Sequence, residues 1–474
     1  MAFIRYKQRG NKWYVYEVSN LWNKETKKYY QETTYLGVAL EKGGEYTKAQ
    51  QRAVLKPEKA IVDFGDGFAI AQIIGSSGLG QVINSSFPEG VAADTIKTLI
   101  AYQLSEGSAM RNCADWAEGN AISKFFPKSN LTSQAISRTI NQIGDEKVMR
   151  TFFANYIAKF FNKKCGILID STAMPSSINS SLNSWGYGAG GIQEKINCLM
   201  LVDKDSKLPI YYRALAGDIA DVSTLQLTVD EVYRLGIEMD QAIFDAGYFS
   251  ESNIKYLAEK KINFISRMPK SRNSFKELLA NISEIEKLEN AVIYGERALF
   301  IESKQIELYG YKMFAHVILD QSKRSSEVKK ILLDKRANPT EKKDHETMIK
   351  NAGYFVLISA ELIEKNEIMP NYYLRQQIEQ IFGFAKNNNS LLPLRVHSEQ
   401  SINGYLMLVF LSLILFVIIK EKLGIAWTVE QALNILRCHK AKIYQNEMVP
   451  IEARKKDKDI YQALSITVPS SLGV

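Results

Sequence analysis

The chain contains few of the residues from which metal–thiolate sites and disulfide frameworks are built. Among its 474 residues there are four cysteines and four histidines. The cysteines are far apart and form no recognisable ligand spacing with the histidines, which argues against a zinc site and against a disulfide scaffold. We therefore expect reduced thiols in a cytosolic protein.

Segments typical of export or of membrane insertion are missing from the pattern as well. The N-terminal stretch MAFIRYKQRGNKWYVYEV has polar residues where a signal peptide has its apolar core. The apolar run from Tyr405 to Ile419 would rise only about 22 Å as a helix, whereas a hydrocarbon core is about 30 Å thick. This run is predicted to be a buried core helix, and no membrane partner is expected.

Charge of one sign is only slightly in excess. Lys and Arg number 60 and Asp and Glu 52, so the formal net charge is +8, which a solvated surface explains as well as nucleic-acid binding does. Within residues 1–60, however, basic residues outnumber acidic ones by 12 to 6. Aromatic and polar residues alternate there, which predicts a basic N-terminal β-hairpin unit over residues 1–60.

A chain of this length exceeds what one hydrophobic core usually serves, so several units are expected. Residues 61–160 have apolar residues at helical spacing and are predicted to form a helical region, which would be a DNA-binding region if one of its helices lies in a DNA groove. One predicted helix in it, 129–145, could recognise DNA ends through Gln134, Arg138 and Asn141. An ordinary amphipathic helix explains the same spacing equally well.

The order of the elements after residue 160 is typical of a ribonuclease H-like fold. Three strands, a helix, a strand, a helix and a strand are predicted at 165–170, 195–203, 208–214, 222–235, 241–245, 250–261 and 263–267. The order predicts an α/β catalytic core over residues 161–269 and 353–425. Residues 270–352 interrupt it and are predicted to form a β-rich insertion domain, and residues 426–474 a C-terminal helical tail.

Two aspartates end apolar strands of this core. Asp170 closes the segment CGILID, and Asp245 closes QAIFD. Because ligands bind beyond the carboxyl ends of strands in open α/β sheets, both side chains are expected at one rim if the strands are neighbours. An aspartate at a strand end also forms turns and caps helices, and that interpretation stays open for each residue alone.

The segment from Pro370 to Lys386 adds a third acidic residue. At 100° per residue along a helix, Tyr372, Arg375, Glu379 and Lys386 fall in one stripe about 60° wide, beside the apolar face. A polar stripe next to a buried face suits the wall of a binding site. A charged surface helix would have the same spacing.

This spacing, Y-x2-R-x3-E-x6-K, resembles the Y-R-E-K motif of DDE transposases of the insertion sequence 4 superfamily. The segment GILIDST resembles the first-aspartate strand of that family, and IFDAGYFS resembles the second. The interruption between the second aspartate and the glutamate agrees as well. The resemblance covers about residues 165–420, and the subgroup typified by insertion sequence 1634 is the most similar.

The resemblance implies a transposase that cleaves and transfers DNA strands at the ends of an insertion sequence, in cut-and-paste DNA transposition. Asp170, Asp245 and Glu379 would be its catalytic residues. They would hold two divalent metal ions, Mg²⁺ with Mn²⁺ as a substitute, because all-oxygen ligand sets select hard cations.

The family's other properties imply the partners. Tyr372, Arg375 and Lys386 would bind DNA phosphates and contribute little base specificity. Double-stranded DNA, as terminal inverted repeats and as target, is the expected partner, bound by a homodimer because two ends must meet. The expected location is the bacterial cytosol or nucleoid, and no nucleotide cofactor is expected.

Two further features give weaker signals. In related transposases an aromatic residue of the insertion stacks on a flipped base, a role that would here pass to Tyr294, Phe300 or Tyr309, or be absent. The loop 183–191, NSWGYGAGG, fits neither a P-loop nor a dinucleotide fingerprint and is interpreted as a substrate-side loop.

Two other functions stay open. A catalytically silent, transposase-derived DNA-binding protein would share the fold, but all three carboxylates and their helix partners are present here. An actin-like phosphotransferase could use Asp170, Ser171 and Thr172 at a nucleotide phosphate. Nucleotide binding without DNA cleavage would favour that second alternative.

Overall fold

The computed structural model describes residues 2–23, 27–48, 58–87, 93–178, 180–188, 191–282, 284–337, 344–387, 396 and 398–473. The chain divides into two compact units, Met1–Glu58 and Lys59–Val474. Each unit has its own sheets and its own buried side chains.

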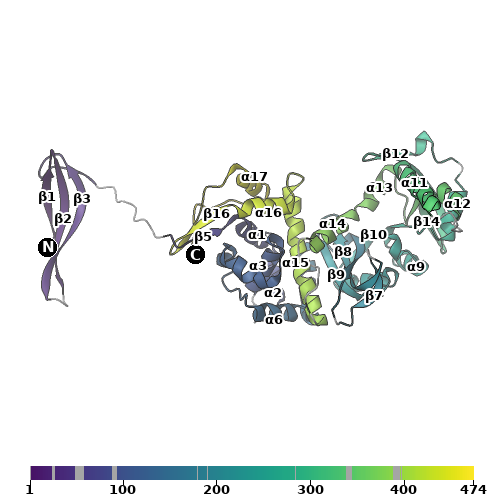
Figure 1. Cartoon of the computed structure of the whole chain (residues 1–474), viewed down its shortest axis with the longest axis horizontal. Coiled ribbons are helices and arrows are strands. Elements are labelled where there is room, and N and C mark those ends of the chain that lie inside the picture. The colour runs from purple at the N-terminus through teal and green to yellow at the C-terminus, as the bar shows by residue number, and fades with distance from the viewer. Residues whose placement is uncertain are drawn as a thin grey trace. The chain divides into compact units, whose positions relative to one another are not determined.

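The N-terminal unit is an antiparallel sheet with the strand order β1-β2-β3-β4 (Figure 1). Its strands are β1 (Ala2–Arg9), β2 (Lys12–Asn23), β3 (Lys28–Ala39) and β4 (Tyr46–Lys48). Val15, Val18 and Ala39 are buried, whereas most aromatic side chains of the unit are partly or fully exposed. Gly10 has a φ of +59° in the turn between β1 and β2, a conformation that favours glycine. The predicted N-terminal hairpin is confirmed.

Several helices, three of which pack against the long helix α15 (Glu399–Leu423), form the start of the second unit. They are α1 (Gly65–Ser76), α2 (Leu79–Ser86), α3 (Ala93–Ser105), α4 (Cys113–Glu118), α5 (Ile122–Phe125), α6 (Ser133–Ile143) and α7 (Glu146–Phe160). Helix α15 is long and apolar enough to cross a membrane, but 89% of its most apolar stretch is buried inside the structure. Figure 1 shows α15 between these helices and the large sheet, as a core helix.

Helix α6 crosses α15 at two glycines. A Cβ atom on Gly144 would lie 1.9 Å from the carbonyl oxygen of Gln400, and one on Gly404 would lie 1.7 Å from that of Ile140. The two backbones therefore approach more closely than any side chain allows. The Gln400 Nε2 donates a hydrogen bond of 2.9 Å to the carbonyl oxygen of Asn141, which fixes the crossing.

The large sheet has ten strands in the order β12-β13-β14-β15-β11-β10-β6-β8-β7, with β9 also paired to β8. The core strands are β6 (Lys164–Pro175), β7 (Ser184–Gly188), β8 (Gly191–Asp203), β9 (Pro209–Ala216), β10 (Glu238–Phe244) and β11 (Asn263–Arg267). Strand β6 pairs in parallel with β10 and antiparallel with β8, and β10 pairs in parallel with β11. The order β9-β8-β6-β10-β11, with β8 reversed, confirms the predicted ribonuclease H-like fold.

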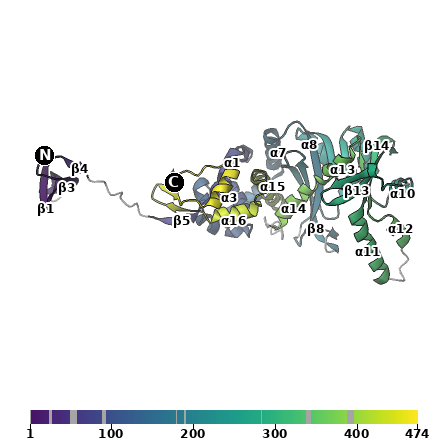
Figure 2. The same ribbon diagram turned by 90° about the horizontal axis from the view of Figure 1, so that it is seen from above.

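The strands of residues 270–352 extend this same sheet. They are β12 (Ala291–Tyr294), β13 (Arg297–Leu308) and β14 (Tyr311–Asp320), and β14 pairs with the core strand β15 (Tyr354–Ser359). Strand β15 pairs in turn with β11. The helices of this segment are α10 (Asn273–Ala280), α11 (Gln321–Ala337) and α12 (His345–Lys350). Figure 2 shows α11 projecting away from the sheet.

Helices cover both faces of the core sheet. Ile167, Leu168 and Ile169 of β6 are all 0% exposed, although successive side chains of a strand point to opposite faces. Helices α8 (Leu225–Arg234) and α9 (Glu251–Glu259) pack against β10 and β11, whereas α14 (Gln376–Asn387) and α15 pack against β6 and β9.

The predicted helix over 370–386 is two helices. Helix α13 (Lys365–Tyr373) already contains Pro370, and α14 begins after a turn at Leu374 and Arg375. The ring of Pro370 removes one backbone donor inside α13, which weakens the helix around it. At the turn, the Arg375 amide bonds only three residues back, to Tyr372, at 3.3 Å. The segment is therefore bent just before it reaches the sheet.

The C-terminal segment, predicted as a helical tail over 426–474, holds strands as well as helices. Its elements are α16 (Val429–Arg437), β16 (Lys440–Ile443), β17 (Glu447–Pro450), α17 (Lys455–Ala463) and β18 (Leu472–Gly473). The strands form a sheet in the order β18-β17-β16-β5, where β5 spans Ala60–Asp63. The end of the chain is thereby joined to the start of the second unit.

Candidate active site

Asp170 and Asp245 occupy equivalent positions on neighbouring strands. In the parallel pair of β6 and β10, Ile169 lies opposite Phe244, and an aspartate follows each of them. Residues paired in this way point to the same face, and neighbouring strands lie about 4.8 Å apart. Strand β10 ends at Phe244 while β6 continues to Pro175, so both carboxylates stand at the rim where the parallel pairing ends.

Arg375 joins the third carboxylate to this rim. Its Nη1 lies 2.7 Å from Oδ2 of Asp170, and its Nη2 lies 3.0 Å from Oε1 of Glu379, one turn further along α14. The side chains of Arg375 and Asp170 are each 15% exposed, so this ion pair is largely shielded from water. The Glu379 side chain is 52% exposed and faces solvent with part of its carboxylate.

Tyr372 holds the other aspartate. Its hydroxyl donates a hydrogen bond of 3.3 Å to Oδ1 of Asp245, and its ring lies 6.0 Å from the Arg375 guanidinium. Burial raises the pKa of Tyr372, and the nearby charge of Asp245 raises it further. The raised pKa keeps the tyrosine a neutral hydrogen-bond donor to the carboxylate at neutral pH.

The charges of the site act on one another. Burial raises the pKa of Asp170 to about 6, and the charges of Asp245 and Glu379 raise it too, against the opposing effect of Arg375. The backbone N–H of Ser171 also favours the ionised carboxylate, through a hydrogen bond of 2.9 Å to Oδ1. For Arg375, burial disfavours the charged form, but the surrounding carboxylates outweigh it and raise the pKa.

Residues 161–415 match the family model of the transposase DDE domain, which is more than half of the chain. The chain belongs to the transposase DDE domain family. Among solved structures it is similar to a piggyBac transposase in a synaptic complex with hairpin DNA, with 11% sequence identity, a TM-score of 0.42 and coverage of 79% of each chain. No curated protein gives a match.

DDE transposases use divalent metal ions, and the chemistry of the donor set here suits such ions. Asp170, Asp245 and Glu379 offer only carboxylate oxygens, which are ligands for hard cations such as Mg²⁺. Within the described ranges, no three acidic, histidine or cysteine side chains are arranged to hold a metal as they stand. Arg375 explains this arrangement, because its guanidinium lies where it bonds to both Asp170 and Glu379.

Lys386, the last member of the predicted stripe, follows Glu379 on the same helix α14 of this transposase. It is at the end of α14, close enough to the buried thiol of Cys198 of β8 for the two groups to affect each other's pKa. Burial lowers the pKa of Lys386. No hydrogen bond or ion pair in the described part of the chain joins it to the three carboxylates. The bend before α14 lies between Tyr372 and Glu379, so it does not separate Lys386 from Glu379.

The residues predicted for end recognition lie on α6, far from these carboxylates in the chain. Gln134 and Arg138 are exposed. Asn141 is only partly exposed, and its Nδ2 lies 3.3 Å from Oγ of Ser401 on α15. Gln134 and Arg138 are therefore accessible to a ligand, whereas Asn141 already contributes to the helix crossing.

Two charged residues near the site were not singled out from the sequence. Asp221, after β9, accepts a hydrogen bond of 2.6 Å from the Ser171 hydroxyl, directly beside Asp170. No spacing in the sequence signals this contact. Arg267 ends β11, and its charge acts on Tyr372. A position at the end of an apolar strand, the signal that identified Asp170 and Asp245, could also have identified Arg267.

The β12–β13 hairpin packs against helix α13. The rings of Tyr294 and Tyr373 are stacked, with centroids 5.5 Å apart, and Nη1 of Arg297 lies 3.2 Å from the Tyr373 hydroxyl. Arg297 is itself held by Asp320 of β14. Of the three aromatic residues considered for base stacking, Tyr294 is thus already stacked on another ring. The hairpin also supports helix α13, which carries Tyr372.

Proposed function

We propose that this transposase cleaves DNA strands at the ends of an insertion sequence and transfers them to target DNA, in a metal-dependent cut-and-paste reaction. The observation that carries the proposal is the meeting of Asp170, Asp245 and Glu379 around Arg375, from β6, β10 and α14. Three carboxylates so close repel one another unless a cation neutralises them. A site that gathers them at a sheet rim suits metal-assisted phosphoryl transfer.

In this proposal Asp170, Asp245 and Glu379 hold two divalent ions, Mg²⁺ or Mn²⁺. When bound, such ions stabilise the attacking and leaving oxygens of an in-line displacement at phosphorus. Tyr372 keeps Asp245 in place through its hydrogen bond. Arg375, once released from the carboxylates, has a planar fork of donors that suits a DNA phosphate.

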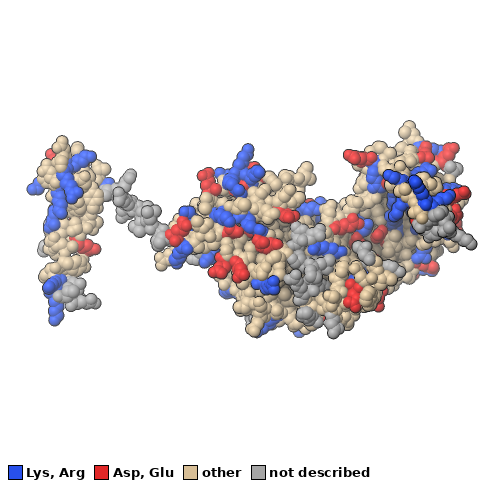
Figure 3. Space-filling model, in the orientation of Figure 1, with Lys and Arg blue, Asp and Glu red and all other residues tan. Residues whose placement is uncertain are grey.

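Basic surfaces support DNA as the partner. Figure 3 shows Lys and Arg gathered over α11, where the exposed basic residues are Lys329, Lys330, Lys335 and Arg336. Contacts of this kind bind phosphates without reading sequence. We propose Lys386 as a further phosphate contact, and Gln134 and Arg138 of α6, with Asn141, as the residues that recognise the DNA ends.

The remaining assignments follow from the motif and from the reaction. The Y-R-E-K spacing supports the insertion sequence 4 superfamily and the insertion sequence 1634 subgroup. Because strand transfer joins two DNA ends, we propose a homodimer on DNA. We further propose that it acts in the cytosol or nucleoid and uses no nucleotide cofactor. The proposed domains are 1–60, 61–160, the core 161–269 with 353–425, the insertion 270–352, and 426–474.

The test is metal-dependent nicking of DNA that carries the repeats flanking the element. We expect the natural chain to nick this DNA with Mn²⁺ and an Asp245→Asn variant to lose at least 100-fold in rate, since a metal ligand is removed. Asp240→Asn is the matched control, because Asp240 lies on the same strand, away from the rim. Equal nicking by the natural chain and by Asp245→Asn would refute the assigned site.

A further inference from the structure

Strand β6 loses one of its two neighbours where Asp170 lies. Its pairing with β10 ends at Ile169, whereas its pairing with β8 continues as far as Pro175. A strand end with a neighbour on one side only has fewer contacts and opens more readily than one paired on both sides. Asp170 therefore depends on side-chain contacts to stay in place at the rim.

The ion pair with Arg375 is one such contact, but it is not present throughout the proposed reaction. Nη1 of Arg375 lies 2.7 Å from Oδ2 of Asp170. In the proposed function the guanidinium leaves the carboxylates and binds a DNA phosphate. A contact that holds Asp170 in both situations must come from another residue.

Asp221 holds the strand from its other face. Successive side chains of a strand alternate in direction, so Ser171 points to the face of β6 opposite to Asp170. The Ser171 hydroxyl donates a hydrogen bond of 2.6 Å to Oδ1 of Asp221, a length typical of a hydroxyl bound to an ionised carboxylate. The backbone N–H of the same serine donates a hydrogen bond of 2.9 Å to Oδ1 of Asp170. Ser171 thus connects Asp221 to the carboxylate of Asp170.

The turn that begins with Asp221, η2 (Asp221–Ser223), is closed by the main chain and not by the carboxylate. The carbonyl oxygen of Asp221 accepts hydrogen bonds from the backbone N–H of Thr224 at 3.1 Å and from its hydroxyl at 2.8 Å. On its other side the carboxylate lies beside the loop after Asp245, because a Cβ atom on Gly247 would lie 3.2 Å from Oδ2 of Asp221. The carboxylate of Asp221 therefore lies beside the segments that follow both aspartates.

A buried amide fixes this turn to the loop after Asp245. Asn253 of α9 is 1% exposed, and its Nδ2 donates hydrogen bonds of 2.8 Å to the carbonyl oxygens of Val222 and of Tyr248. Val222 directly follows Asp221, and Tyr248 lies three residues after Asp245. The position of Asp221 is therefore tied to that of the second aspartate, and Ser171 carries this tie to the first.

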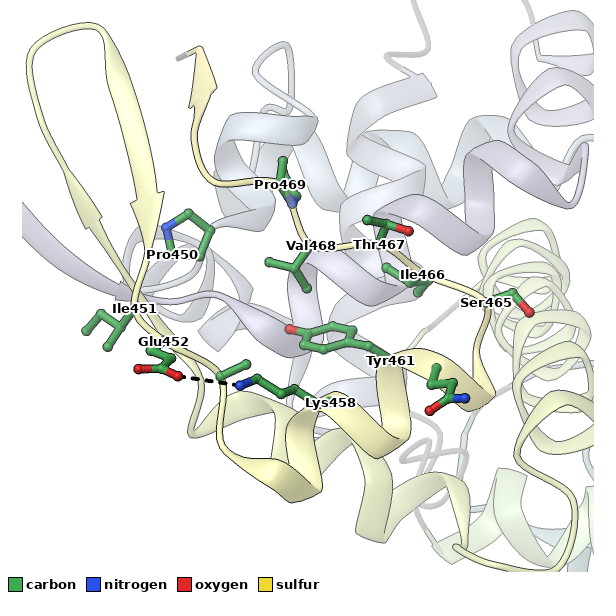
Figure 4. Close-up of a pocket in the computed structure, with 12 residues that line it drawn as sticks. Pro450, Ile451, Glu452, Lys458, Tyr461, Ser465, Ile466, Thr467, Val468 and Pro469 are labelled. Carbon is green, nitrogen blue, oxygen red and sulfur yellow. Dashed lines mark hydrogen bonds and ion pairs between the residues drawn. The ribbon is translucent and has the colours of Figure 1, made fainter.

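Another acidic side chain at a pocket of this unit has no such connection. The pocket in Figure 4 has a volume of about 670 Å³, lies between β17 and the residues after α17, and is lined by Glu452. Glu452 lies 3.5 Å from Nζ of Lys458, and its side chain is 89% exposed. An exposed ion pair of this kind contributes little to stability. Glu452 is therefore a suitable control for the removal of a carboxylate.

We propose that Asp221 is a positioning residue of the active site, which holds Ser171 and thereby keeps Asp170 in place at the rim when Arg375 has left. Asp221 does not itself bind a metal ion, because its carboxylate is engaged by the serine hydroxyl on the face of β6 opposite to Asp170. The purpose of this positioning rests on the proposed function, whereas the contact itself is present in the protein without metal or DNA.

The first part of the test is hydrogen exchange of the full chain in EDTA, read by mass spectrometry. Asp221→Ala should speed exchange in the peptide that contains Ser171 by about tenfold or more, the size expected for the loss of a hydrogen bond to a charged group. Asp221→Asn keeps an acceptor oxygen for the hydroxyl and should restore most of the protection. Glu452→Ala should leave exchange in this peptide unchanged.

The second part is the affinity for Mn²⁺ in the absence of DNA, measured by electron paramagnetic resonance of the free ion. Asp221→Ala should weaken binding by about 10- to 100-fold, as is usual when a residue that orients a metal ligand is removed. Ser171→Ala should cost about as much, and the double variant no more than either, because all three remove the same hydrogen bond. Asp221→Asn should bind Mn²⁺ more tightly than Asp221→Ala does.

The outcomes separate this inference from the proposed function. An Mn²⁺ affinity that is unchanged in Asp221→Ala overturns the inference, even where the natural chain binds Mn²⁺ and nicks DNA. Equal losses in Asp221→Asn and Asp221→Ala also overturn it, because the carboxylate would then touch the ion itself. A natural chain that binds no Mn²⁺ refutes the proposed function alone: faster exchange at Ser171 in Asp221→Ala, restored in Asp221→Asn, then still supports the inference, and unchanged exchange overturns it. Circular dichroism of each variant confirms that the fold is kept.

Discussion

Replacing Asp170 with asparagine should stabilise the metal-free protein at alkaline pH. Burial raises the pKa of Asp170 from 3.8 to about 6. Below pH 3.8 the carboxyl group is protonated in both the folded and the unfolded chain, so its burial does not lower the free energy of unfolding. As the pH rises through 3.8 to 6, the unfolded chain ionises first, so stability is lost, and above pH 6 the full cost is present.

The size of the effect follows from the shift. About two pKa units at 1.36 kcal/mol each give about 3 kcal/mol. Asparagine has the shape of the neutral acid and cannot ionise, and Arg375 keeps its ion pair with Glu379 at 3.0 Å. The Asp170→Asn variant should therefore gain about 3 kcal/mol at pH 8 and almost nothing at pH 4. At about 2.1 cal/mol/K of unfolding entropy per residue, the unit Lys59–Val474 should melt about 3 °C higher at pH 8.

The assay is scanning calorimetry of the natural chain, Asp170→Asn and Asp240→Asn in EDTA at pH 4, 6 and 8. The difference between Asp170→Asn and the natural chain should grow with pH, and Asp240→Asn should show no such growth. A gain that is equal at pH 4 and pH 8, or a loss of stability at pH 8, would show that Asp170 is not a carboxylate strained by its burial.

Three further predictions concern the surroundings of the site. Gly404→Ala should lower the free energy of unfolding by more than about 3 kcal/mol, since its Cβ would lie 1.7 Å from a backbone oxygen. Gly383→Ala, inside helix α14 with no atom near its Cβ, should instead raise it by about 0.5–1 kcal/mol, and urea titration compares the two variants. Arg297→Met should cost about 3 kcal/mol in the same titration, because the buried carboxylate of Asp320, whose side chain is 2% exposed, loses its partly exposed charge partner. Arg375→Gln should let Mn²⁺ bind at least about tenfold more tightly in the absence of DNA, by titration calorimetry, because no guanidinium then competes for the carboxylates.

The rim of the sheet could be predicted from the sequence because it depends on local pattern. Apolar strands that end in aspartate are readable, and parallel pairing then places Asp170 beside Asp245 without further information. The stripe of Tyr372, Arg375 and Glu379 was also readable, since three of its members stay close even though the helix bends. Lys386 follows Glu379 by about two turns of α14 and has no contact with the carboxylates among the described residues, because tertiary packing sets where this end of the helix lies.

Other features depend on partners that are distant in the chain. Strand β14 joins the core sheet by pairing with β15. The sequences of the strands do not determine which strand edge β14 pairs with. The pairing of β16 with β5 links residues near 440 to residues near 60. The position of Lys195 opposite Ser184 arises only where β7 and β9 meet on β8.

The most direct measurement of the central claim is iron-directed cleavage of the polypeptide. Fe²⁺ bound in place of Mg²⁺, with ascorbate and peroxide, releases hydroxyl radicals that cut the backbone near the ion. We predict three clusters of cuts, at Asp170, Asp245 and Glu379, that excess Mg²⁺ and the Asp245→Asn variant both suppress. Cuts at two or fewer of these positions, or cuts that persist in Asp245→Asn, would contradict a shared metal site.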